Sequence, residues 1–145
     1  MLEQVVITGP VTLTGSSFSP MYEELVKLMC DYAKTVWSPL DTLRFDGPNQ
    51  ERYRRAMDLV AKSSLVIALV SNPSTGQGME IQEAARHGIP VWAFAASGSK
   101  VSGLIQGCPV VREVLYFEST TELARILRER LDQVEGSGHD AVPAQ

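Results

Sequence analysis

Hydrophobic residues in this chain fall into short unbroken runs separated by stretches with helical spacing. The clearest run, Leu65–Val70, has no alternating polar position, which is typical of a strand buried on both faces of a parallel sheet. Turn residues follow at Asn72–Gly76, and from Gly78 to about His87 the apolar residues recur at helical spacing. A second buried run, Pro90–Phe94, comes next. The sequence therefore predicts a strand, a loop, a helix and a strand in succession.

The rest of the chain predicts further strands and helices around this unit. Strands are expected at Val5–Thr8, Thr35–Ser38 and Glu113–Phe117, and helices at Ser19–Lys34, Gln50–Lys62, Val101–Gly107 and Ser119–Val134. We expect Asn49 to cap the second of these helices, and Ser119 to cap the last one in a capping box with Glu122.

The alternation of strands and helices, with short connections between them, predicts the architecture. We expect a three-layer α/β/α sandwich with a five-stranded parallel sheet, flavodoxin-like or Rossmann-like, in strand order 2-1-3-4-5. This order places the most apolar strand at the centre of the sheet. Residues 1–134 would form this domain, and residues 135–145, which have too few apolar side chains to pack, would form a disordered tail.

The loop that follows Leu65–Val70 is the first candidate ligand site. It opens at the carboxyl end of the central strand, where open α/β sheets bind ligands, and it carries Ser74, Gly76, Gly78 and Glu80. Glycines let backbone N–H groups approach a phosphate or a ribose hydroxyl closely, and a helix N-terminus adds partial positive charge. We expect Glu80 in the first helical turn, where it would either point into the crevice or complement the helix dipole.

Two other segments are expected at the same edge of the sheet. Gly9 ends the first strand and is either a point of close approach to a ligand or a plain turn glycine. Pro39–Gln50 is predicted to be a long loop whose only large side chains are Arg44 and Phe45. That loop would serve as a lid, as a wall that recognises a base, or simply as an exposed connection.

Composition and charge narrow the function classes. The chain has 145 residues, 44% of them hydrophobic, which suits one domain with a real core. A net charge of −4 argues against a surface that coats a nucleic acid polymer, although it permits one nucleotide in a local pocket. The basic residues Arg52, Arg54 and Arg55 would meet a phosphate or form a solvated helix face.

Cysteines and hydropathy indicate the compartment. Cys30, expected on the apolar side of a helix, and Cys108 show no metal spacing and no disulfide framework, so reduced thiols in a cytoplasmic protein are expected. The sequence shows no leader-like start and no apolar run long enough to cross a membrane. We expect no metal and no cofactor.

Several segments together resemble one known family. The central one is Ala68–Ala84, with sequence ALVSNPSTGQGMEIQEA. The others, which occur in the right order, are Val6–Pro10, His87–Val91, Ser102–Gly107 and Val114–Tyr116. The chain resembles the nucleoside 2-deoxyribosyltransferase superfamily over about residues 5–131. It is most similar to the branch of nucleoside 5′-monophosphate N-glycosidases, which contains 2′-deoxynucleoside monophosphate hydrolases and cytidylate hydrolases.

The resemblance implies a function and a set of site residues. Glu80, in the Gly-x-Gly-x-Glu motif, would be the nucleophile that attacks the anomeric carbon and displaces the base, and water would then hydrolyse the glycosyl ester. The implied substrate is a nucleoside 5′-monophosphate, bound by a homodimer in which Ser102 reaches the phosphate site of the neighbouring subunit. The residues implied to bind the substrate are Gly9, Ser74, Gly76, Gly78 and Ser102.

The chain departs from the family pattern on the helix before the central strand. The family carries an aspartate there, and this chain has Ala56 at that position, with Ser63-Ser64 in place of an Ala-Asp pair. Asp58 is two positions away, which is a rotation of roughly 200° around a helix. Tyr53, three residues before Ala56, shares its face of the helix and would enter the pocket.

The missing aspartate leaves several readings open. Either another acid serves, namely Asp58 after a local shift or Asp46 from the preceding loop, or hydrolysis is weak or absent. The candidate catalytic residues are Glu80, Asp58 and Tyr53. The alternatives to a nucleotide N-glycosidase are a 2-deoxyribosyltransferase and a non-catalytic nucleotide-binding or sensor protein.

Overall fold

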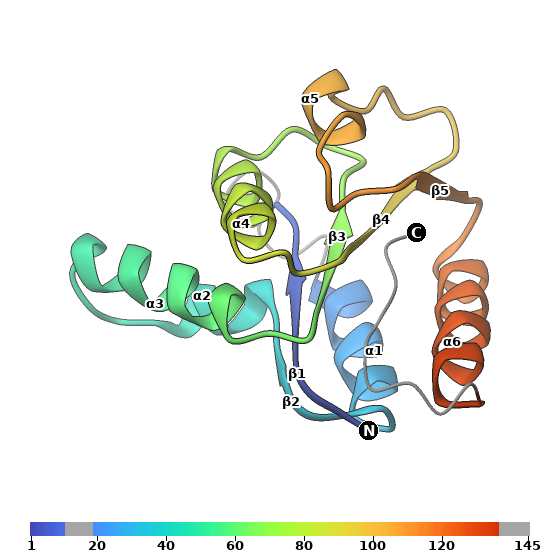
Figure 1. The fold of residues 1–145 in the computed structure, drawn as a ribbon, viewed down its shortest axis with the longest axis horizontal. Helices are drawn as coiled ribbons and strands as arrows, with labels where there is room; N and C mark the ends of the chain where they lie inside the picture. Colours follow the sequence, from blue (N-terminus) through green and yellow to red (C-terminus); the bar gives the residue numbers. More distant parts are fainter. Residues whose placement is uncertain (11–18, 137–145) are drawn as a thin grey trace.

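A parallel sheet forms the centre of the computed structural model, which describes residues 1–10 and 19–136 (Figure 1). Its strands are β1 (Leu2–Thr8), β2 (Ala33–Trp37), β3 (Leu65–Leu69), β4 (Val91–Ala96) and β5 (Val114–Phe117). They are ordered β2-β1-β3-β4-β5, and every neighbouring pair is parallel. The predicted fold class and strand order are therefore confirmed.

Helices cover both faces of this sheet. They are α1 (Ser19–Met29), α2 (Pro39–Arg44), α3 (Asn49–Ala61), α4 (Thr75–Arg86), α5 (Gly103–Gln106) and α6 (Thr120–Gly136). Helices α1 and α6 pack on one face, and α3 and α4 pack on the other, which gives the three layers expected from the alternating pattern (Figure 1).

The alternation of side chains along each strand divides the core into two halves. In β3, Leu65, Ile67 and Leu69 face α1 and α6, whereas Val66 and Ala68 face α3 and α4. All five residues of this strand are buried, because the strand is central and has helices on both sides. This explains why the central run in the sequence has no polar position.

The segment after β2 corrects one prediction. Residues 39–44 form helix α2 instead of part of a loop. Pro39 occupies the first turn, the Leu40 backbone N–H donates to Ser38 Oγ at 3.2 Å, and the Ser38 N–H donates to Asp41 Oδ2 at 2.8 Å. This reciprocal capping box stabilises a helix that is too short to show hydrophobic periodicity.

Other boundaries and positions differ from the predictions in ways that matter less for the fold. Pro48, and not Asn49, is the N-cap of α3, and no side chain caps that end. Helix α1 ends at Met29, because β2 already begins at Ala33. Cys30 is exposed just beyond α1 and does not pack on its apolar side. The predicted loop around residues 11–18 and most of the predicted tail lie outside the described residues.

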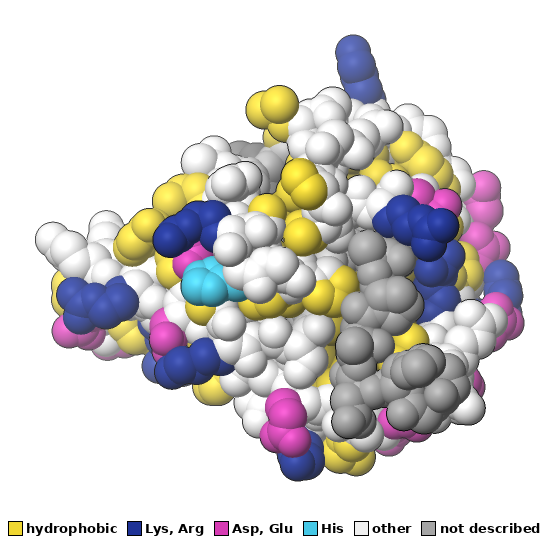
Figure 2. All heavy atoms as spheres, in the orientation of Figure 1, with side chains coloured by type: hydrophobic (Ala, Val, Ile, Leu, Met, Phe, Trp, Pro, Cys, Tyr) yellow, Lys and Arg dark blue, Asp and Glu magenta, His cyan; other side chains and the backbone are white. Residues whose placement is uncertain are grey.

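The surface is mixed in charge. On the face shown in Figure 2, basic and acidic side chains are interspersed and several lie next to one another. No helix among the described residues is long and apolar enough to span a membrane. Within the same ranges, no group of histidine, cysteine, aspartate or glutamate side chains could hold a metal ion.

Candidate active site

A cleft of about 1480 Å³ opens at the carboxyl edge of the sheet. It lies beside the carboxyl ends of β1 and β2 and the start of α4, the helix that follows β3. The chain turns in opposite directions along the sheet from β1 to β2 and from β3 to β4, so this is the point where an open α/β sheet binds ligands. Its walls come from the segments after β1 and β2, from α3, from the start of α4 and from the residues around α5.

Glu80 lies in this cleft and is partly buried. Burial raises the pKa of its carboxyl group to about 7, and a hydrogen bond with the Thr8 side chain opposes that rise. Helix α4 begins at Thr75, three residues earlier than predicted, so Glu80 lies in the second turn and not the first. The simple reading of Glu80 as a first-turn acid that complements the helix dipole is therefore wrong. Among the described residues Glu80 forms no ion pair.

Tyr22 is a site residue that the sequence reasoning missed, because its spacing placed it on the apolar face of α1. Its side chain is buried, and its hydroxyl donates to the Pro10 carbonyl oxygen at 3.0 Å. Burial first, and the Glu80 charge second, raise the pKa of the Tyr22 phenol, so this hydroxyl lies near the Glu80 carboxylate. A polar end on a buried aromatic residue was the available signal.

Gly9 lies against the Tyr22 side chain, a contact that neither interpretation of this glycine from the sequence included. A Cβ atom at this position would lie 2.3 Å from the Tyr22 hydroxyl oxygen. The glycine therefore lets Tyr22 pack against the end of β1, and it also lines the cleft.

Gln77 is a second residue that the sequence reasoning missed. It is buried one turn before Glu80, and its side-chain amide donates to the Thr8 carbonyl oxygen at 3.1 Å and to the Leu69 carbonyl oxygen at 2.7 Å. These two carbonyl groups belong to the carboxyl ends of β1 and β3. Gln77 thus links the carboxyl ends of β1 and β3, one helical turn away from Glu80.

The predicted phosphate-binding residues gather at the start of α4. Ser74 is the N-cap, and its Oγ accepts from the Gln77 backbone N–H at 3.3 Å. A Cβ atom on Gly76 or Gly78 would meet no atom outside the adjoining helix backbone within 4 Å, so both glycines border open space in the cleft. Ser102 lines the same cleft from the α5 side, and its side chain makes no capping hydrogen bond.

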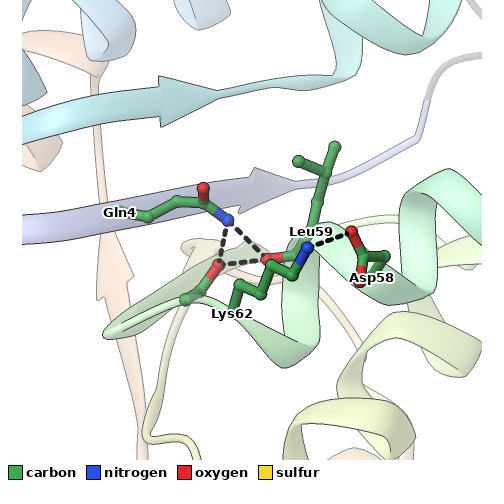
Figure 3. A network of polar contacts seen from close by, with 5 residues as sticks. Gln4, Asp58, Leu59 and Lys62 are labelled. Atoms are coloured by element: carbon green, nitrogen blue, oxygen red, sulfur yellow. Dashed lines mark hydrogen bonds and ion pairs between the residues drawn. The ribbon is translucent and has the colours of Figure 1, made fainter.

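The candidate acids on α3 and before it do not join Glu80. Asp58 pairs with Lys62 at 2.9 Å on the exposed side of the helix, as Figure 3 shows, and it does not line the cleft. Asp46 is exposed and also lies outside the lining. Tyr53 and Ala56 do line the cleft, as their shared helix face predicted. The rotation between positions 56 and 58 directs Asp58 away from the site.

Ser63 takes a structural role at the end of α3. Its hydroxyl donates to the Leu59 carbonyl oxygen at 2.6 Å, and the Gln4 side-chain amide donates to the same carbonyl at 2.7 Å and to Ser63 Oγ at 3.4 Å (Figure 3). The Ser64 backbone N–H also donates to the Gln4 carbonyl oxygen at 2.8 Å. The serine pair therefore anchors α3 to β1 and provides no acid.

Two proteins with the name "Putative 2′-deoxynucleoside 5′-phosphate N-hydrolase 1" are similar to this chain in sequence. The one from Syntrophotalea carbinolica is 33% identical over 124 residues, which cover 81% of this chain and 87% of that protein. The one from Methanosarcina barkeri is 42% identical over 60 residues, 41% of this chain and 38% of that protein. No family model matches the sequence.

Solved structures that share the fold include three enzymes. The CMP N-glycosidase of Clostridium botulinum superposes with a TM-score of 0.69 at 19% identity, over 88% of this chain and 99% of that one. A 2-deoxyribosyltransferase from Bacillus psychrosaccharolyticus gives 0.63 at 14% identity, over 83% and 90%. The enzyme of the same name from Leishmania mexicana gives 0.59 at 17% identity, over 87% and 97%.

Proposed function

Because the chain belongs to the nucleoside 2-deoxyribosyltransferase superfamily and groups with its 2′-deoxynucleoside 5′-phosphate N-hydrolases, we propose that it hydrolyses the N-glycosidic bond of a nucleoside 5′-monophosphate. The products are a free base and a sugar 5-phosphate. The observation that carries the proposal is the placement of Glu80 in the cleft at the carboxyl edge of the sheet, where it is partly buried and forms no ion pair with any described residue.

Glu80 acts as the nucleophile. An ionised Oε atom attacks the anomeric carbon, the C–N bond breaks, and the base departs with the electron pair. Water then hydrolyses the glycosyl ester and regenerates the carboxylate, as in retaining glycosidases. The hydrogen bond with the Thr8 side chain orients the carboxylate, and Gln77 fixes the strand ends on either side of it.

The start of α4 holds the 5′-phosphate. The first N–H groups of a helix have no partner within the helix, and the helix dipole favours an anion at this end. Ser74 Oγ accepts from Gln77 and can still donate its own proton to a phosphate oxygen. Gly76 and Gly78 leave room for that phosphate, because no atom outside the adjoining helix backbone would lie within 4 Å of a Cβ on either residue.

A second copy of the chain completes the site. Ser102 of the partner subunit would donate to the same phosphate, in a homodimer. This arrangement is supported by the exposure of the rim on which Ser102 lies, where the Leu104 side chain is 88% exposed. Leu104 is an apolar side chain that contact with a partner would bury.

The test is incubation with a panel of ribonucleoside and 2′-deoxynucleoside 5′-monophosphates, followed by chromatography of the free base. We expect release from at least one of them, and no release by a Glu80→Gln variant that still binds the nucleotide. Glu129→Gln is the matched control, because Glu129 pairs with Arg125 on α6, on the other side of the sheet. Unchanged turnover by the Glu80→Gln variant would disprove the role of Glu80 as the nucleophile.

Ala56 favours a second candidate function. The family pattern has an aspartate at this position, and the structure places Ala56 on the cleft wall with no carboxylate from Asp58 or Asp46 to replace it. A non-catalytic nucleotide-binding or sensor protein would bind monophosphates in the same panel and release no base. A 2-deoxyribosyltransferase would instead exchange the base when a free acceptor base is added.

A further inference from the structure

One wall of the cleft consists of aromatic rings interleaved with guanidinium groups. Trp37 ends β2, Phe45 follows α2, and Arg52 and Arg55 come from α3; all four side chains line the cleft. The Arg55 guanidinium carbon lies 5.2 Å from the centroid of the Trp37 ring and 5.5 Å from that of Phe45. The Arg52 guanidinium carbon lies 5.2 Å from the Phe45 centroid. Stacking of this kind fixes a guanidinium group and leaves its in-plane N–H groups available.

The two arginines differ in what else they bind. Arg52 donates to the Thr42 carbonyl oxygen at 2.8 Å and to the Phe45 carbonyl oxygen at 3.2 Å, so it holds the turn between α2 and α3. Arg55 makes no hydrogen bond and no ion pair with any described residue. Arg86, which also lines the cleft, pairs with Glu83 at 3.0 Å. Arg55 is therefore a cation on the wall with its donors unused by the described part of the chain.

Apart from Glu80, the carboxylic acids of the cleft lining are engaged with other groups of the protein, so none of them supplies a proton to the departing base. Asp41 is engaged in the capping box of α2, and Glu83 pairs with Arg86 and His87. The residue next to Arg55 is Ala56, whose methyl group leaves space and supplies no proton. A base that leaves as an anion therefore needs its charge stabilised in another way.

We propose that Arg55 is a catalytic residue that donates hydrogen bonds to the departing base and stabilises its negative charge. This assignment rests on the proposed function and deepens it by naming the class of base. A guanidinium group offers only donors, so it fits a base with a carbonyl oxygen conjugated to the glycosidic nitrogen. Uracil, thymine, cytosine, hypoxanthine and guanine have such an oxygen, whereas adenine has an amino group in its place.

The step balances without a further reactant. Glu80 Oε forms a bond to the anomeric carbon while the C–N bond breaks, and the electron pair of that bond moves onto the base and its carbonyl oxygen. Arg55 keeps its protons, because guanidinium groups do not lose them in proteins. Water protonates the base anion, and the resulting hydroxide hydrolyses the glycosyl ester.

A comparison of leaving groups tests the role of Arg55. The probes are the ribo- and 2′-deoxy 5′-monophosphates of uracil, 5-fluorouracil, hypoxanthine and adenine. 5-Fluorouracil carries negative charge more easily than uracil and needs less stabilisation. We expect Arg55→Ala to lower kcat/KM about 100-fold with uracil and about 10-fold with 5-fluorouracil, the range that loss of a charge-assisted hydrogen bond produces. We also expect a larger loss with hypoxanthine than with adenine, and partial recovery in Arg55→Lys.

The control is Arg54→Ala, which removes a neighbouring arginine that is exposed and does not line the cleft, and which we expect to leave all rates unchanged. Equal losses with uracil and 5-fluorouracil would overturn the proposal, because a merely structural role would not depend on the leaving group. Turnover of adenine nucleotides alone would overturn the class of base. Failure of the wild-type chain to release any base would instead overturn the proposed function, and the role of Arg55 with it.

Discussion

At the scale of single residues, the ionisation of Glu80 controls the proposed chemistry. Only the carboxylate can attack the anomeric carbon, and burial raises the pKa of this group to about 7. We therefore expect kcat/KM for base release to rise as pH increases towards about 7 and to fall about tenfold per pH unit well below it. Initial rates between pH 5 and pH 9 check this expectation. A profile that is already level at pH 5.5 would mean that the nucleophile has an ordinary carboxyl pKa.

The residues that the sequence reasoning identified and those it missed differ in where their partners lie. Glu80 and Ser74 belong to one continuous segment, so their proximity follows from a single helix. Tyr22 contacts Pro10 and Gly9, and Gln77 contacts Thr8, and these contacts exist only once α1, β1 and α4 are assembled. Helical spacing accounts for the burial of Tyr22 but contains no information about the partner of its hydroxyl.

At the scale of elements, side-chain caps fix the starts of two helices that hydrophobic periodicity does not predict. Four residues, Ser38-Pro-Leu-Asp41, form the capping box that begins α2, and no amphipathic pattern can appear over so few positions. Likewise, Ser74 caps the start of α4 through its hydroxyl, whereas the turn residues Asn72–Gly76 had predicted a helix that begins only at Gly78. That shift of three residues moves Glu80 from the first turn to the second.

The two serines of the proposed phosphate site differ in one respect: Ser74 also caps a helix, whereas Ser102 makes no capping hydrogen bond. Substitution of each serine therefore distinguishes an effect on stability from an effect on ligand binding. Ser74→Ala removes a cap and is expected to lower the free energy of unfolding by about 1 kcal/mol, as well as to weaken nucleotide binding. Ser102→Ala removes no capping hydrogen bond, so stability is expected to be unchanged. The Ser102 variant should bind monophosphates more weakly and nucleosides almost as well as before. Urea unfolding and calorimetric titration with both ligands measure these effects; equal losses for both ligands would remove the phosphate role of Ser102.

At the scale of the whole molecule, the sheet order could be predicted because the central strand is the most apolar. The six buried residues Leu65–Val70 fit only a position with neighbours on both sides and helices on both faces. The surface around the cleft could not be predicted in this way. Tyr53, Met79 and Leu104 line the cleft and are 55%, 45% and 88% exposed, and no sequence pattern distinguishes such residues from core residues.

These exposed side chains are consistent with the proposed homodimer, and hydrophobic side chains are also visible over α4 and α5 in Figure 2. Ser102 lines the cleft of its own chain, so it could serve either that cleft or the cleft of a partner. Sedimentation velocity establishes whether the chain is a dimer. Subunit complementation then decides which cleft Ser102 serves, because Glu80 and Ser102 can be changed in separate chains.

We expect a mixture of Glu80→Gln and Ser102→Ala chains, unfolded together and refolded in equal amounts, to recover about a quarter of the wild-type rate at low substrate concentration. Random pairing makes about half of the dimers mixed, and each mixed dimer has one intact site of two if Ser102 acts in trans. Glu80→Gln with Ser74→Ala is the control. Ser74 caps α4 and Glu80 lies on it, so both belong to the site of one chain and no mixed dimer can contain an intact site. A rate no higher than the average of the two separate variants would show that Ser102 serves its own chain.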